Sequence, residues 1–166
     1  THVKQLAEAI VTDGRGCVVV VNKMDLMPTL ASADALTESV HRQFPHLDWA
    51  PVLATSALTN AGVGRVLTTA LQSADAWRRI LTPDELAGVH AAVKRRIPKP
   101  RNTIAKSKIT MVEIRQTGSM PPTFLVRTRK RVRLPKAIPS IIEQTIRSRH
   151  DFTGTPIRIV TKSIKS

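Results

Sequence analysis

The chain has one cysteine, no tyrosine and few aromatic side chains, which make up 3% of its 166 residues. The single Cys17 excludes a disulfide framework within the chain and is most simply a small core residue. No apolar run approaches the roughly 20 residues needed to cross a bilayer, and the first residues do not form a signal-peptide pattern. With so few aromatic rings, recognition of single-stranded nucleic acid by base stacking is not expected.

Charge is distributed unevenly along the chain. Residues 1–81 hold seven Lys or Arg and seven Asp or Glu, so this half is neutral. Residues 82–166 hold nineteen basic and five acidic side chains, and therefore carry the whole net charge of +14. This division predicts two domains, residues 1–81 and 82–166, and a polyanionic partner for the second. A solvated basic face without a partner is the alternative interpretation.

Four consecutive valines, Val18–Val21, lie immediately before the polar run Asn22-Lys23-Met24-Asp25. Such a run is typical of a parallel strand buried on both faces, and ligands of open α/β sheets bind beyond the carboxyl ends of the strands. An Asn amide can donate and accept hydrogen bonds, whereas an Asp carboxylate can accept two from the adjacent N–H and NH2 groups of guanine. Taken alone, this run is equally consistent with a strand that ends in a polar turn.

A second short apolar segment, residues 51–55, ends in Ser56-Ala57-Leu58 and is followed by a glycine-containing helix start. The two motifs, in this order and each after its own strand, resemble the fourth and fifth guanine-nucleotide motifs of GTPases. The resemblance implies that Asn22 and Asp25 read the guanine and that Lys23 covers its face. It also implies that Ser56, Ala57 and Leu58 complete a site for GTP or GDP, in which the backbone N–H of Ala57 meets the guanine oxygen.

The phosphate-binding half of a GTPase site is absent from the sequence. It contains no Gly-x-x-x-x-Gly-Lys-Ser/Thr loop to hold the phosphates, and no Asp-x-x-Gly magnesium loop follows a predicted strand. We therefore predict that the chain as written does not hydrolyse GTP, and we assign it no catalytic residue and no metal ligand. Because it starts at Thr1 with half of a nucleotide site, we expect it to be a piece of a longer polypeptide.

Hydrophobic periodicity predicts the order of helices and strands. In the first half, we expect helices at residues 3–11, 32–44 and 62–76 and strands at 17–21 and 47–55, with Val63, Val66, Leu67, Ala70 and Leu71 of the third helix facing inward. In the second half, Thr82 and Glu85 form a capping box before a helix that ends at Lys94-Arg95-Arg96. Strands at 108–116 and 123–128, a helix at 136–150 and a strand at 155–160 complete an α+β domain of order α-β-β-α-β.

Two further segments make the resemblance specific to one family of GTPases. Pro121-Pro122-Thr123-Phe124 and the run Phe152-Thr153-Gly154-Thr155-Pro156-Ile157-Arg158-Ile159 look like the KH-like C-terminal domain of the double GTPases called Der or EngA. The first half, through Ser56-Ala57-Leu58-Thr59 and Gly62-Val63, resembles the end of that family's second GTPase domain. The fold implied is an α/β remnant of a P-loop GTPase domain followed by a KH-like domain, and the function implied is assembly of the large ribosomal subunit. Met24 departs from the family, which usually has Trp there.

The second half has no Gly-x-x-Gly loop, so the usual KH clamp on single-stranded RNA is not expected. Phosphate contacts and recognition of folded RNA shape remain, and they require Arg and Lys. The candidate RNA-binding residues are Lys99, Arg101, Lys106, Lys108, Arg127, Arg129, Lys130, Arg131 and Arg133. We expect large-subunit rRNA, ribosomal proteins or other assembly factors as partners, and neither DNA nor a membrane, because these cations do not lie on an amphipathic helix.

Three interpretations stay open from the sequence. The chain belongs to a GTP-binding ribosome-assembly factor, or to an active GTPase whose front half lies outside this sequence, or it is a structural rRNA-binding protein with a degenerate GTPase remnant. Replacing Asp25 with alanine distinguishes the third interpretation from the other two. Function should be unchanged if the chain is a structural protein, whereas guanine preference should be lost in the other two cases. The Arg-rich second half favours the mitochondrial matrix, with the bacterial cytoplasm as the alternative.

Overall fold

The structure is a computed structural model, and it describes residues 2–26, 32–97, 111–129 and 137–163. The chain divides into two compact units. The first unit comprises Thr1–Arg78 and Phe152–Pro156, and the second comprises Arg79–Asp151 and Ile157–Ser166. Because a compact unit is defined by contacts and not by independent folding, the domain boundary predicted at residues 81 and 82 stays a prediction.

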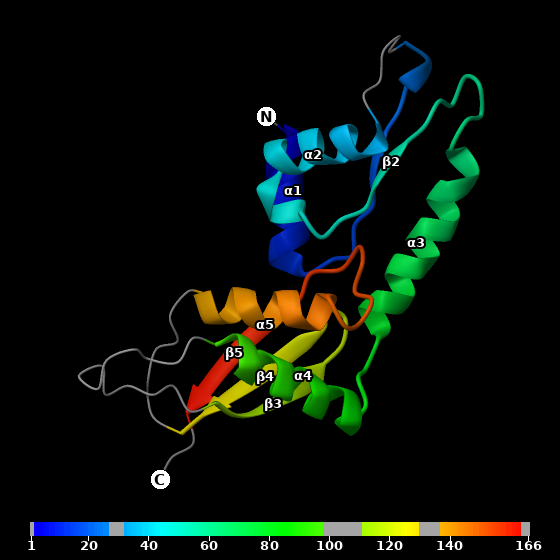
Figure 1. Cartoon of the computed structure of the whole chain (residues 1–166). Helices are drawn as coiled ribbons and strands as arrows, with labels where there is room; N and C mark the ends of the chain where they lie inside the picture. The colour runs from blue at the N-terminus through cyan, green and yellow to red at the C-terminus, as the bar shows by residue number, and fades with distance from the viewer. Residues whose placement is uncertain (1, 27–31, 98–110, 130–136, 164–166) are drawn as a thin grey trace. The chain divides into compact units, whose positions relative to one another are not determined.

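The first unit has a two-stranded parallel sheet with helices around it (Figure 1). Strand β1 pairs with β2 so that Val19, Val20 and Val21 lie opposite Val52, Leu53 and Ala54. Helix α2 packs against β2, and α1 packs against the short helix η2. The elements are α1 (His2–Asp13), β1 (Val19–Val21), η1 (Met24–Leu26), α2 (Ala33–Gln43), η2 (Pro45–Leu47), β2 (Val52–Ala54) and α3 (Val63–Arg78).

Two expectations for these strands were wrong. Val18–Val21 was predicted to be buried on both faces, yet β1 starts at Val19 and the side chain of Val20 is 42% exposed. The strand predicted at residues 47–55 is only Val52–Ala54. Proline explains the shortening, because Pro45 opens η2 and Pro51 has no N–H for the ladder, although its carbonyl accepts from the N–H of Val19 (2.9 Å).

Helix α3 exposes the apolar stripe that was predicted to face inward. Leu67 is 68% exposed and Leu71 is 58% exposed, whereas Ser73 and Ala76 are the buried residues of this helix. The periodicity was read correctly as a helix. The predicted orientation was wrong for Val63, Leu67, Ala70 and Leu71, which are exposed, whereas Val66 is half-buried.

The second unit begins with α4 (Pro83–Arg96), whose start the sequence predicts correctly. The hydroxyl of Thr82 accepts from the N–H of Glu85 (3.3 Å), and the Glu85 carboxylate accepts from the N–H of Thr82 (2.7 Å). This capping box satisfies two of the helix N–H groups that would otherwise lack a partner. Lys94, Arg95 and Arg96 occupy the last turn, where the helix dipole favours positive charge.

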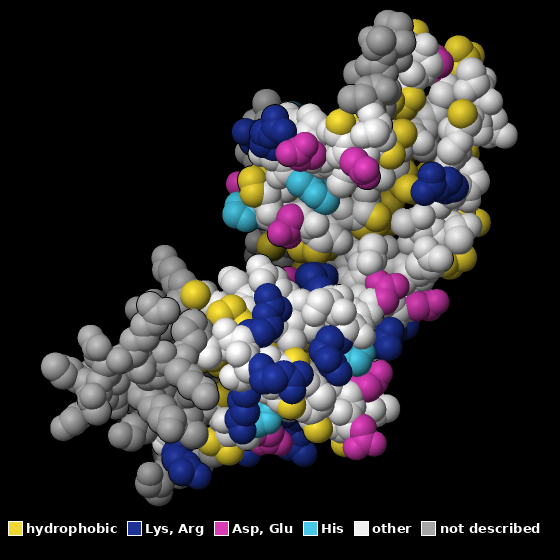
Figure 2. Space-filling view, viewed as in Figure 1, with side chains coloured by type: hydrophobic (Ala, Val, Ile, Leu, Met, Phe, Trp, Pro, Cys, Tyr) yellow, Lys and Arg dark blue, Asp and Glu magenta, His cyan; other side chains and the backbone are white. Residues whose placement is uncertain are grey.

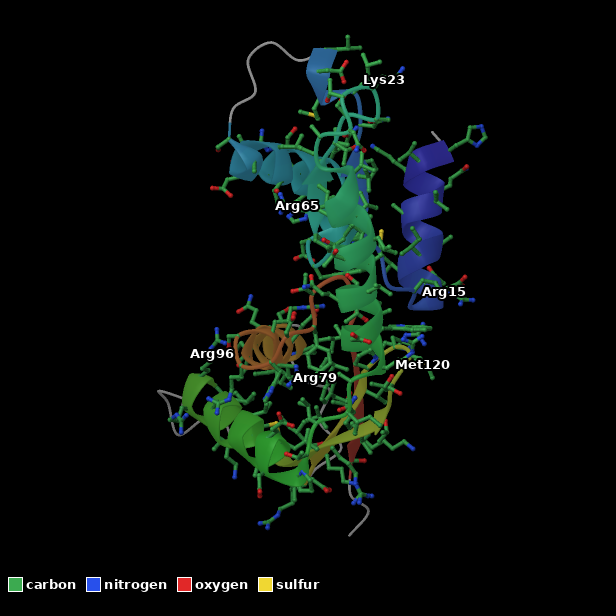
Figure 3. All side chains as sticks on the ribbon, turned by 90° about the vertical axis from the view of Figure 1, so that its right-hand side faces the viewer. Arg15, Lys23, Arg65, Arg79, Arg96 and Met120 are labelled. Atoms are coloured by element: carbon green, nitrogen blue, oxygen red, sulfur yellow. The ribbon has the colours of Figure 1, made fainter. Side chains whose placement is uncertain are left out.

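The remaining elements of the second unit are β3 (Met111–Gly118), β4 (Thr123–Thr128), α5 (Ala137–Arg147) and β5 (Arg158–Ser163). The sheet has the order β3-β4-β5, with β3 antiparallel and β5 parallel to β4. Helices α4 and α5 lie on the same face of this sheet, and they contact each other (Figures 1 and 3). The order α-β-β-α-β agrees with the prediction.

The core of the second unit lies between its helices and one face of its sheet. Val89 and Val93 of α4 and Phe124 and Val126 of β4 have no exposed surface. Ile138, Ile142 and Ile146 recur every fourth residue along α5, and all three are buried. Burial of each isoleucine contributes about 2 kcal/mol, so this apolar stripe is a main source of the stability of the unit.

The last strand differs from the prediction. It was expected at residues 155–160, but β5 spans Arg158–Ser163. Gly154 has a positive φ of 73° and turns the chain, and Pro156 cannot donate to a ladder, so pairing starts later. Residues 152–156 group instead with the first unit, an arrangement that the sequence did not indicate.

Candidate guanine loops and a cationic sheet

The carboxyl ends of β1 and β2 bring the two predicted guanine motifs together. Parallel pairing of Val21 with Ala54 places Asn22 and Ser56 at the same edge of the sheet. The loops are joined by the backbone, because the N–H of Thr55 donates to the carbonyl of Val21 (2.9 Å) and the N–H of Met24 donates to that of Thr55 (3.1 Å). Figure 3 shows Lys23 at this end of the first unit.

Asn22 connects the two loops through its side-chain oxygen. Its Oδ1 accepts from the backbone N–H of Ala57 (3.0 Å) and from the hydroxyl of Thr55 (3.4 Å). Because an N–H donor needs an acceptor, the Ala57 contact fixes which end of the amide is oxygen. The NH2 end of Asn22 is therefore the end that can donate to a ligand.

Asp25 is held by the second loop as well. The hydroxyl of Ser56 donates to Oδ1 of Asp25 and accepts from the N–H of Thr59 (3.2 Å). Ser56 is buried, whereas Asp25 lies on the surface. A carboxylate has about four acceptor positions, so Asp25 keeps the capacity to accept from an N–H and an NH2 group while bound to Ser56.

The shape of the second loop depends on Gly62. The N–H of Ser56 donates to the carbonyl of Ala61 (2.9 Å), which closes the loop on itself. Gly62 has a φ of +73°, and an added Cβ would lie 2.4 Å from the carbonyl oxygen of Ala54. Only glycine fits there, so the glycine noted after Ser56-Ala57-Leu58 has a structural role in positioning the loop.

Three details of these loops bear on the expected guanine site, which stays a prediction. The N–H of Ala57 was expected to meet a guanine oxygen, but it donates to Asn22, so guanine would require this amide to exchange partners. The side chain of Leu58 is 85% exposed. Lys23 is exposed with a positive φ of 65°, a conformation that belongs to the turn between β1 and η1.

The described residues contain no cluster of His, Cys, Asp or Glu that could hold a metal ion. Nor does any described helix have the length and hydropathy needed to cross a membrane. Cys17 is half-buried beside β1, and burial raises the pKa of its thiol. The side chains of Asn22 and Asp25 at this edge offer hydrogen-bonding groups to a ligand.

The predicted RNA-binding residues fall mostly outside the described residues. Among them, the structure describes only Arg127 in β4 and Arg129 immediately after it, and both are exposed. Those outside are Lys99, Arg101, Lys106, Lys108, Lys130, Arg131 and Arg133. Strand pairing adds cations that the sequence analysis missed, namely Arg115, Arg158 and Lys162, whose side chains are exposed on β3 and β5.

Comparison with known proteins assigns the second half of the chain to a protein family. Residues 79–162 match the family described as the KH-domain-like, C-terminal domain of EngA bacterial GTPase enzymes. The chain belongs to the Der (EngA) family. The matching residues correspond to the C-terminal domain of the proteins of this family. This match confirms the prediction of a KH-like second half, which was made from Pro121–Phe124 and Phe152–Ile159.

Relatives of the Der family match nearly the whole chain. A GTPase Der from Nitrobacter winogradskyi is 31% identical over 95% of the chain and 34% of its own length. Those from Lactobacillus acidophilus and Geotalea uraniireducens are 27% and 28% identical over 92% of the chain, and 35% and 34% of their own lengths. The chain therefore spans about a third of the length of these curated relatives.

Proposed function

We propose that the protein is a GTP-binding ribosome-biogenesis factor that acts in assembly of the large subunit by binding rRNA through its basic KH-like domain. The observation that carries this proposal is the KH-like domain of residues 79–162 together with a net charge of +14 that comes entirely from residues 82–166. A polyanion is the partner that such a charge favours.

The first unit, in this proposal, is the C-terminal half of a P-loop GTPase domain. The parallel pairing of β1 with β2, and the contacts of Asn22 and Asp25 with the Ser56-Ala57 loop, support it. These residues would recognise the guanine of GTP or GDP. Phosphate binding and magnesium would need a segment that the 166-residue sequence does not contain.

A second candidate is a non-hydrolysing, structural rRNA-binding protein that keeps the GTPase remnant without using it. The absence of a phosphate-binding loop from the sequence favours this candidate. Both candidates require rRNA binding by the second half, and they differ only in whether guanine recognition matters.

Sedimentation with purified large-subunit particles tests both candidates. The full-length protein is compared with its Asp25→Ala and Asp75→Ala variants, and Asp75→Ala is a control that removes the same charge from an exposed position of α3. We expect wild type and control to sediment with the particles in a GTP-sensitive manner, and Asp25→Ala to lose that sensitivity. Sedimentation that is equal for all three and independent of GTP would favour the structural candidate, and no sedimentation would contradict both.

We also propose a mitochondrial compartment, supported by the basic, Arg-rich second half, with a bacterial cytoplasm as the alternative. Fractionation of the source cells with an antibody against the chain tests this, and recovery outside the organelle fraction would contradict it.

A further inference from the structure

We infer that the face of the β3-β4-β5 sheet opposite α4 and α5 is the surface on which the protein binds the RNA backbone. This inference rests on the proposed function and adds the surface that performs it. We call this surface the open sheet face, and it includes Glu113, Arg115, Leu125, Arg127, Arg158, Val160 and Lys162.

Alternation along β4 identifies the residues on each side of the sheet. Phe124, Val126 and Thr128 are buried and face the helices. Because neighbouring residues of a strand point to opposite faces, Leu125 and Arg127 point away from the helices. Arg127 is exposed and Leu125 is half-buried, as expected for a face that no other described element of the second unit covers.

The register extends this face to both neighbouring strands. Lys162 lies directly opposite Arg127, Val160 opposite Leu125, and Arg158 opposite Thr123. On the other side, Arg115 lies opposite Leu125 and Glu113 opposite Arg127. Paired residues share a face, and adjacent strands are about 4.8 Å apart, so cations from three strands are neighbours on one surface.

The balance of charge on this face is positive. It has four cations and one acid, Glu113, whose carboxylate lies 3.5 Å from the guanidinium of Arg127. Both side chains of this ion pair are more than 40% exposed, so water screens the pair and it contributes little to stability. Arg127 therefore loses little if its guanidinium turns to a phosphate.

An apolar pair lies in the middle of these cations. Val160 is 41% exposed although it sits within β5, and its partner in the register is Leu125. Exposed apolar surface with a polar rim is typical of an interaction site. The rim is cationic, which favours a polyanion. None of the described residues of this face is aromatic, which favours contact with backbone and sugar over stacking of bases.

The helical face of the second unit is the competing surface. Figure 2 shows that Lys and Arg also gather over α4 and α5. Two cations of these helices make contacts within the fold: Arg96 donates to Thr145 (2.9 Å) and to Gln144 (3.2 Å), and Arg147 is paired with Glu143 (2.8 Å). Asp84 and Glu85 on α4 further reduce the positive charge of this face.

Matched triple variants of the whole chain distinguish the two faces. The test variant is Arg115→Gln/Arg127→Gln/Lys162→Gln on the open sheet face. The control is Lys94→Gln/Arg95→Gln/Arg149→Gln on the helical face, which removes the same charge from three exposed positions. Affinity for a large-subunit rRNA fragment is measured from 50 to 300 mM salt, and circular dichroism establishes that each variant is folded.

We expect the test variant to lose at least ~10-fold in affinity and to lower the salt slope by about 2 to 3, because each phosphate contact releases about one counterion. The control should keep its slope. If the control loses affinity and the test variant does not, or if both lose it equally, the inference is overturned while rRNA binding by the chain stands. If wild type fails to bind rRNA, or an acidic polypeptide displaces it as well as RNA does, the proposed function fails too.

Discussion

The backbone N–H of Cys17, just before β1, donates to the carbonyl of Gly154, between α5 and β5 (2.8 Å). The N–H of Gly154 in turn donates to the carbonyl of Trp49 (3.0 Å). These two hydrogen bonds connect residues 152–156 with the N-terminal part of the first unit. Segment 152–156 therefore contributes to the stability of the first unit, although it lies within the residues that match the KH-like family.

Replacing Gly154 with alanine should destabilise the protein strongly. Gly154 has a φ of +73°, and an added Cβ would lie 2.0 Å from Oγ and 2.6 Å from Cβ of Ser73. The left-handed conformation and the overlap together predict a loss of at least about 2 kcal/mol in the free energy of unfolding. Urea denaturation measures it.

Gly64→Ala is the matched control for Gly154→Ala. Gly64 lies in α3 with nothing within 4 Å of an added Cβ, so alanine there should leave stability unchanged or raise it by about 0.5 kcal/mol. A double-mutant cycle with Ser73→Gly should recover part of the loss at Gly154. Additive effects of the two changes would show that Gly154 and Ser73 are not in contact.

Removing the Thr82 hydroxyl should weaken α4. Thr82→Ala deletes the acceptor for the N–H of Glu85 and should lower the free energy of unfolding by about 1 kcal/mol. Ser32→Ala is the control, because Ser32 precedes α2 without a capping hydrogen bond from its side chain. Equal losses for both variants would contradict the capping box as the cause.

Stability should fall as the pH drops from about 7 to 5. Burial lowers the pKa of His150 and of His90 below the ordinary imidazole value of about 6.5. At His150, the positive charges of Arg79 and Arg149 lower the pKa further, whereas the negative charge of Glu85 raises it. At His90, the positive charge of Lys94 lowers the pKa further, whereas that of Glu113, which is negative, raises it. The unfolded chain then binds more protons than the folded one, so acid favours unfolding.

Histidine variants test this pH dependence. His150→Gln should lessen the decline in melting temperature between pH 7 and 5, because the depressed pKa is removed. His46→Gln, at an exposed position, should leave the decline as in wild type. A decline that is identical in all three proteins would contradict the assignment to His150.

Asp25 should determine the choice of base. Its carboxylate can accept from the N–H and NH2 of guanine, whereas an Asn amide can accept from the ring N–H and donate from its NH2 group to the carbonyl of xanthine. Asp25→Asn should therefore weaken GTP binding and strengthen XTP binding, each by about 1–3 kcal/mol. Competition between the two nucleotides for the full-length protein measures this preference. Unchanged GTP preference would contradict the role of Asp25.

Local sequence signals predicted much of the second unit. The capping box of Thr82 and Glu85 and the four-residue spacing of Ile138, Ile142 and Ile146 depend on neighbours along the chain, so one sequence is sufficient to identify them. The two predicted guanine motifs were likewise visible as polar residues after apolar strands, and the structure brings them within hydrogen-bonding distance.

Features that depend on distant residues could not be predicted. The apolar stripe of α3 identified a helix but not which side of it the first unit covers. The cations Arg115, Arg158 and Lys162 share a face only because of the register of three strands, and a single sequence does not specify that register. The hydrogen bond between Cys17 and Gly154 is a further example, since nothing near either residue indicates the other.

The most direct test of the account is a salt titration of the 166-residue chain with large-subunit rRNA. Several phosphate contacts predict that the logarithm of the binding constant falls linearly with the logarithm of salt, with a slope of about −4 or steeper. An absence of binding at 50 mM salt, or an affinity that does not change with salt, would contradict the claim that the basic KH-like half holds the RNA backbone.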